Sequence, residues 1–330
     1  MKMKSWLLGI GLLLTNLAFG QTIQDGLHLL DRHQPSRAKQ IFEGLVSAAP
    51  TGENYFYLGY SYLTQRNWDA AKAAFEKGKA ADPKNYLNQV GLASILVGQN
   101  NVSAAKVEFD RILAETKNKN IDVMYRIAEA YAMYYILGKE ESFNANNNDP
   151  AEAIRLIDAI QDRLMKDKKM PTVEHYIVKG DAYLIKNDGG NAVTAYETGL
   201  MQDPKNVKAK VKIGTVYLRG KNYKETQARY KEAIDLDSNY APAHRRYGEY
   251  LIVGGQYKNA SRYFRRYLEK AEATPEVTLE TAKLLFLSKD YEGAMKFTDD
   301  ADKRGVKDND IFRMRGYSNV EMGNFQQGID

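Results

Sequence analysis

The chain has 330 residues with 47 basic and 42 acidic side chains, a formal net charge of +5. Hydrophobic residues make up 44% and charged residues 27%, which excludes wholesale disorder. The mean hydropathy of −0.54 excludes a polytopic membrane protein. Because the sequence contains no cysteine, it also excludes disulfides, thiolate metal sites and lipid attachment at a cysteine.

The first twenty residues have the pattern of a secretory signal peptide. Lys2 and Lys4 precede an apolar run over residues 6–14, and Ala18-Phe19-Gly20 then places small residues at positions −3 and −1 of a cleavage site. The apolar stretch is shorter than the roughly 20 residues that a spanning helix needs, and no lipoprotein cysteine follows it. We therefore expect cleavage after Gly20 and export to the periplasm or cell envelope.

Beyond the signal, small residues recur at a near-constant spacing. The interval is 34 residues four times in succession from Gly180 to Gly316, and it varies by one elsewhere except across one insertion. A second small residue usually follows twelve positions later, and a ring such as Phe75 or Tyr196 four positions after that. Apolar residues three and four apart predict two amphipathic helices per repeat, A and B. The recurring small residues of helix A are Gly26, Gly59, Ala93, Ala128, Gly180, Gly214, Gly248, Ala282 and Gly316.

The pattern resembles the tetratricopeptide repeat. Residues 55–62, with Ala71, Phe75 and Pro83, match nearly every place of that motif, and the resemblance runs from about residue 22 to the end. It implies an all-α, right-handed superhelical solenoid of antiparallel helix hairpins over residues 21–330. About nine repeats are expected, because a single hairpin cannot bury its own apolar face and needs stacked neighbours.

Two departures from the pattern stand out. The third repeat is interrupted by a polar insertion near residues 139–150, rich in asparagine, which predicts a loop. The last repeat reaches Asp330 as its helix B begins, so an incomplete last repeat and a longer natural chain are expected. The insertion and a signal ending in Phe-Gly-Gln resemble secreted repeat proteins of the Bacteroidetes group.

Motifs with catalytic potential have structural interpretations. Ser36-x-x-Lys39 and Ser103-x-x-Lys106 share one repeat position, which predicts helix starts rather than nucleophiles. The four histidines are scattered, and residues 300–311 lack the ligand pattern of a calcium loop. The arginines at 262, 265 and 266 favour a solvated helix face, with an acidic-partner patch as the alternative. We therefore predict no catalytic, cofactor or metal site and no enzymatic activity.

The resemblance implies that the A helices line a concave groove. If the small residue of helix A is place 8 of the repeat, places 5 and 9 point into the groove, with places 2 and 12. The Lys and Asn by which one subclass grips a terminal carboxylate do not occur together here. The candidate groove residues are Phe56, Tyr60, Tyr125, Glu129, Asp181, Arg245 and Glu249.

These observations predict a non-enzymatic scaffold or adaptor of the bacterial periplasm or cell envelope that binds a peptide or helix in its groove. The alternative is a docking or regulatory arm of an enzyme or envelope-anchoring protein whose other domain lies beyond residue 330. A protein or peptide partner is expected, and the small positive charge argues against nucleic acid. No membrane span is expected in the mature chain, and the oligomeric state stays open.

Overall fold

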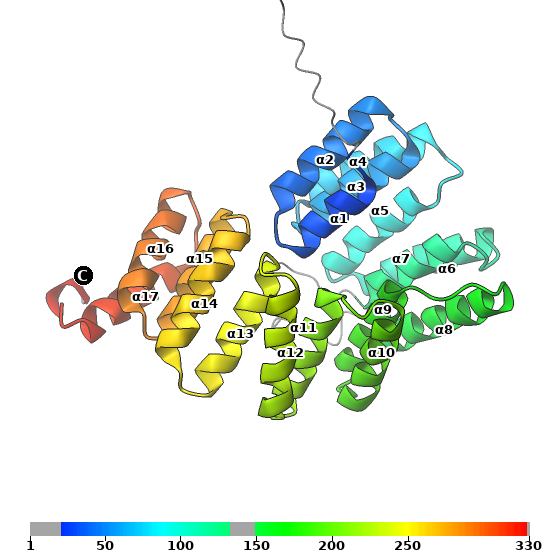
Figure 1. The fold of residues 1–330 in the computed structure, drawn as a ribbon. Coiled ribbons are helices and arrows are strands. Elements are labelled where there is room, and N and C mark those ends of the chain that lie inside the picture. The colour runs from blue at the N-terminus through cyan, green and yellow to red at the C-terminus, as the bar shows by residue number, and fades with distance from the viewer. Residues whose placement is uncertain (1–20, 133–148, 329–330) are drawn as a thin grey trace, which may run out of the picture.

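The computed structural model describes residues 21–132 and 149–328, which form helices and connecting turns without a β-strand (Figure 1). Consecutive helices pack as antiparallel hairpins, which confirms the all-α solenoid. The hairpins are α1 (Ile23–Asp31) with α2 (Pro35–Ala48), α3 (Gly52–Thr64) with α4 (Trp68–Ala81), α5 (Leu87–Gly98) with α6 (Val102–Glu115), α7 (Ile121–Tyr131) with α8 (Pro150–Lys166), α9 (Val173–Ile185) with α10 (Gly189–Gln202), α11 (Val207–Arg219) with α12 (Tyr223–Leu236), α13 (Ala241–Val253) with α14 (Tyr257–Lys270) and α15 (Pro275–Leu287) with α16 (Tyr291–Lys303), before α17 (Asn309–Glu321) and a 3₁₀ turn at Gln326–Gly328.

A left-handed residue followed by a cap forms most turns between helices A and B. Asn67 and Asn101 accept hydrogen bonds from the backbone N–H groups of Ala70 and Ala104, which satisfies donors at the start of α4 and α6. The residue before the cap has a positive φ, and Gly255 adopts it without a Cβ clash. The non-glycine residues in this conformation at equivalent turns, with φ between 57° and 64°, are His33, Arg66, Asn100, Asn187, Lys221 and Lys289.

The hairpins are packed by a ring of helix B against the small residue of helix A. A Cβ added to Gly59 would lie 2.4 Å from the ring of Phe75, and one added to Gly214 would lie 2.6 Å from that of Tyr230. Both rings are fully buried. A larger residue at either glycine would therefore overpack the hairpin.

Parts of the predicted organisation lie outside the described residues. These parts are the signal peptide at 1–20 and most of the insertion near 139–150. In the predicted last repeat, a Cβ at Gly316 would meet the backbone carbonyl of Gly328, at 3.4 Å, rather than a ring. Within residues 21–132 and 149–328, no helix is both long enough and apolar enough to cross a membrane.

The superhelix turns far enough for its first hairpin to touch its seventh (Figure 1). The backbone N–H of Glu272, after α14, donates to the carbonyl of His33 in the α1–α2 turn at 2.8 Å. The side chain of Gln34 donates to the carbonyl of Lys270 at 2.7 Å. Helices α1 to α14 thus form a closed turn around a central space, and α15 to α17 continue beyond it (Figure 1).

Candidate functional site

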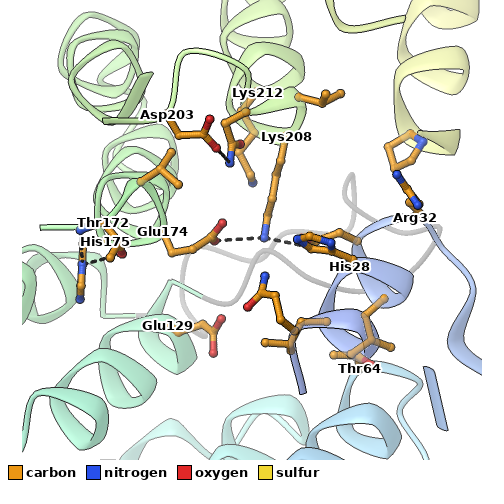
Figure 2. A pocket seen from close by; sticks show the side chains of 18 of the residues that line it. His28, Arg32, Thr64, Glu129, Thr172, Glu174, His175, Asp203, Lys208 and Lys212 are labelled. Atoms are coloured by element: carbon orange, nitrogen blue, oxygen red, sulfur yellow. Dashed lines mark hydrogen bonds and ion pairs between the residues drawn. The ribbon is translucent and has the colours of Figure 1, made fainter. Parts of the chain in front are cut away.

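A cavity of about 930 Å³ lies inside the closed turn (Figure 2). Its walls come from α1, α3, α7, α9 and α11, with the segments before α11 and at the start of α13. These are the A helices that the repeat pattern predicts for the concave side. The cavity therefore collects side chains from repeats that are far apart in the sequence.

Four aromatic rings surround the guanidinium of Arg126 on the first wall of the cavity. The centre of the guanidinium lies 5.4 Å from the ring centroid of Phe56, 5.5 Å from that of Tyr57, 4.9 Å from that of Tyr60 and 5.1 Å from that of Tyr125. Each ring face attracts a cation, so the cage fixes this arginine from α3 and α7 together. We call these five residues the arginine cage.

Glu129 closes the arginine cage by accepting three hydrogen bonds. Arg126 donates to it at 2.7 Å, the hydroxyl of Tyr60 at 3.1 Å and that of Tyr125 at 3.4 Å. Burial, and next the negative charge of Glu129, raise the pKa of both tyrosines above the usual value. Both hydroxyls therefore stay protonated and serve as hydrogen-bond donors at neutral pH.

The opposite wall is organised by lysines of α11. The ammonium of Lys208 reaches Asp31 of α1 at 3.0 Å and Glu174 of α9 at 3.4 Å, so it links three helices across the cavity (Figure 2). Lys212 lies 2.7 Å from Asp181, a carboxylate that is only 2% exposed and also accepts from the hydroxyl of Tyr196. The charges on this wall are thus fixed by partners from neighbouring repeats.

The structure divides the predicted groove residues into two sets. Tyr60, Tyr125 and Glu129 come together and line the cavity, and Phe56 packs behind them in the arginine cage. The other three do not line it. Asp181 is buried against Lys212 of the next repeat, whereas Arg245 pairs with Glu249 of its own helix and with Glu280 of the next repeat.

Repeat reasoning overlooked several residues that shape the cavity. Arg126, Lys212 and Arg246 line it and all stand at place 6, which is not among the groove places that the resemblance implies. The pairs Arg126–Glu129 and Arg246–Glu249, both at 2.7 Å, join place 6 to place 9 in two different repeats. This recurring arginine–glutamate spacing is the sequence signal that could have identified place 6 as part of the cavity wall. Arg32 also lines the cavity, but only the closed turn brings it there. Among the described side chains, no three possible metal ligands cluster closely enough to hold an ion.

Comparison with known proteins supports the same fold. A family model described as tetratricopeptide repeat matches residues 24–86 and 211–275. Tetratricopeptide repeat protein 1 of Schizosaccharomyces pombe is 30% identical over 81 residues, which are 24% of this chain and 8% of that protein, so the chain spans a small part of this relative.

Two solved structures share the fold at low identity. A tetratricopeptide repeat protein from Parabacteroides merdae has a TM-score of 0.50 and 15% identity, over 84% of this chain and 99% of that one. The human IFIT1 dimer with PPP-AAAA has a TM-score of 0.54 and 14% identity, over 93% of this chain and 69% of that one. The family model thus supports tetratricopeptide repeats in the two matched segments, and the solved structures support the fold of the described chain.

Proposed function

We propose that this protein is a non-enzymatic scaffold that binds a peptide segment of a partner protein in its central cavity. Tetratricopeptide repeat proteins generally mediate protein–protein interaction. The observation that carries the proposal is the convergence of A helices from several repeats on one cavity of about 930 Å³. That volume suits a short segment and excludes a folded domain.

The side chains of the cavity walls suit the binding of a peptide rather than catalysis. The hydroxyls of Tyr60 and Tyr125 keep their protons because their pKa values are raised, and both donate to Glu129, which leaves their oxygens as hydrogen-bond acceptors. Arg126 is held charged by Glu129 and by the surrounding rings. An extended peptide can place its backbone N–H groups against these oxygens, its carbonyls against Arg126 and its apolar side chains against the rings.

Location and wider context belong to the same proposal. The basic start, apolar run and Ala18-Phe19-Gly20 site support export to the periplasm or cell envelope of a bacterium, with a mature chain that begins at Gln21. A role as the docking arm of a longer enzyme or envelope protein is compatible with the same cavity. N-terminal sequencing of the exported protein tests the export step, and a retained Met1 would contradict it.

Binding is tested with residues 21–330 on an array of peptides from the producing organism's exported proteins. The Tyr60→Phe/Tyr125→Phe variant keeps the rings but removes both hydroxyls, so retained peptides should lose about tenfold in affinity. Tyr223→Phe on α12 is the matched control, because that tyrosine is 44% exposed and outside the cavity lining. Equal retention by all three proteins, or no retained peptide, would overturn the proposal.

The same assay also tests nucleic acid as a ligand of the cavity, by competition with an oligonucleotide. The predicted exclusion of nucleic acid rests on the small net charge alone, and human IFIT1, which shares the fold, was solved with PPP-AAAA. A triphosphorylated oligo(A) added as competitor should leave peptide retention unchanged. Displacement of the peptides by the oligonucleotide would make nucleic acid the better candidate for the cavity.

A further inference from the structure

The contacts that close the superhelical turn form one compact set. Residues 31–36, at the end of α1 and the start of α2, meet α11, the segment before α13, and the end of α14. We call these contacts the closure contacts. They comprise Asp31–Lys208 at 3.0 Å, Arg32–Asp237 at 2.7 Å, His33 Nδ1 with the Tyr267 hydroxyl at 3.2 Å, Gln34 with the Lys270 carbonyl at 2.7 Å, the Glu272 N–H with the His33 carbonyl at 2.8 Å, and the Ser36 N–H with the Glu272 carboxylate at 2.6 Å.

All of the closure contacts are polar, and several remain accessible to water. In the Arg32–Asp237 pair the side chains are 39% and 20% exposed. Ion pairs of this kind contribute little net stability, because water and salt screen them and both partners hydrate well when separated. The closure contacts can therefore break and re-form without loss of the fold.

The closure contacts are also part of the cavity wall. Asp31, Arg32 and His33 line the cavity from α1, and Asp237 and Lys208 line it from the facing side. Separation of the two sides would open the cavity along its length. Among the described helices, the α1–α2 hairpin is the first of the stack and α3 is its sequential neighbour. Small rotations between successive repeats can therefore carry it away from α13 and α14.

We propose that the α1–α2 hairpin is a reversible gate, held by the closure contacts, that controls entry of a ligand chain into the cavity. A ligand that binds only the open form shifts the chain toward it, whereas one enclosed by the closed form is retained. This inference concerns regulation of the cavity and rests on the proposed function, but its physical test needs no peptide.

Because the sequence has no cysteine, Thr64→Cys adds a single thiol on the cavity wall (Figure 2). The probe is a bulky dye-maleimide, compared with small N-ethylmaleimide on the same protein. Arg32→Ala/Ser36→Ala in this background removes the Arg32–Asp237 pair and the hydrogen bond that the Ser36 hydroxyl donates to the Glu272 carboxylate. The double variant should speed bulky labelling about tenfold, with little change for the small reagent. Ser47→Ala/Arg313→Ala removes the same residue types elsewhere and should change neither rate, since Ser47 bonds within α2 and Arg313 is 72% exposed.

Equal bulky-labelling rates in all three backgrounds would overturn the gate. Should the closure variant lose its helical circular dichroism, 1 M salt applied to the Thr64→Cys protein replaces it, because salt weakens the same ion pairs. Salt should then accelerate bulky labelling, and no acceleration counts against the gate. A peptide array without any hit would refute peptide binding but would leave these rates as they are, so the two failures are distinguishable.

Discussion

Two kinds of interface hold this molecule in shape, and they differ in chemistry. Within the stack, buried rings such as Phe75 and Tyr230 press against glycines of the preceding helix. Across the closed turn, residues 31–36 meet the far side through ion pairs and hydrogen bonds, such as Arg32–Asp237, and through an edge contact between the rings of His33 and Tyr267. The apolar stack therefore determines whether the chain folds, and the polar closure determines whether the folded chain encloses its cavity.

The largest change in stability is expected at a buried ion pair inside the stack. Lys212 neutralises Asp181, which is 2% exposed, so Lys212→Met leaves a buried carboxylate without its cation. We expect a loss of about 3 kcal/mol in the free energy of unfolding, measured by urea denaturation. Lys106→Met is the control, because Lys106 and Asp110 are 48% and 54% exposed and their pair should contribute under about 1 kcal/mol. Equal losses of unfolding free energy in the two variants would contradict the distinction between buried and exposed ion pairs.

The next effect concerns the ring–glycine contacts. Gly59→Ala puts a Cβ 2.4 Å from the Phe75 ring, so we expect a loss of about 1–3 kcal/mol in unfolding free energy. Gly44→Ala in α2 is the matched control, since its Cβ would meet no atom within 4 Å. That change should stabilise the helix by about 0.5–1 kcal/mol. Thermal or urea melts of both variants measure the contrast, and a stabilised Gly59→Ala would refute the packing account.

The closure should respond to pH through His33. This ring faces the Tyr267 hydroxyl of α14 and the cations Arg245 and Arg246 of α13, and Glu272 binds its backbone. Burial, and next the two arginines, lower the pKa of His33 to about 3 in the closed form. In the open form its pKa returns toward about 6.5. Above about pH 6.5 the His33 ring is neutral in both forms. Below it the ring takes up a proton in the open form but not in the closed form, so acid weakens the closure.

Between pH 7.5 and 5.5 the closure should weaken by no more than about 1.4 kcal/mol. Small-angle scattering should show the radius of gyration rising at the lower pH. His33→Asn keeps a residue that tolerates the positive φ but removes the titrating ring, so its radius should change less with pH. A wild-type radius that falls on acidification contradicts this assignment.

The smallest stability effect is expected at the closure itself. Arg32→Ala should change the free energy of unfolding by less than about 1 kcal/mol, because the pair with Asp237 is partly exposed. Scattering on the same samples should nevertheless show a larger radius of gyration. A large stability loss would mean that the closure belongs to the folding core, and the contrast between the two interfaces would fail.

The difference between the interfaces also explains what the sequence could predict. The 34-residue register located Gly59, Gly214 and their rings, because those partners lie within one hairpin at a fixed separation. It could not place His33 beside Tyr267, because that contact depends on small rotations summed over seven hairpins. The sequence therefore predicted the stack, while the closed turn emerged only in the structure.

The same limit applies to the candidate groove. Tyr60 and Glu129 lie together on the cavity wall, joined by a hydrogen bond at 3.1 Å. Asp181 and Arg245 occupy groove places too, but side chains at place 6 of the next repeat, Lys212 and Glu280, cover them. The position of a residue in the repeat predicts which way its side chain points. It does not predict which residue of the next repeat forms an ion pair with that side chain.

The most direct test of the closed turn is a cross-link in this cysteine-free chain. The Glu272 N–H binds the His33 carbonyl at 2.8 Å, so the backbones of these two residues touch across the closed turn. Under mild oxidation of dilute monomer, His33→Cys/Glu272→Cys should lose two hydrogens in intact mass and run faster on non-reducing gels. Ser47→Cys/Glu272→Cys, with one cysteine moved along α2, should stay reduced. A His33/Glu272 pair that stays reduced while the protein is folded would contradict the closed turn.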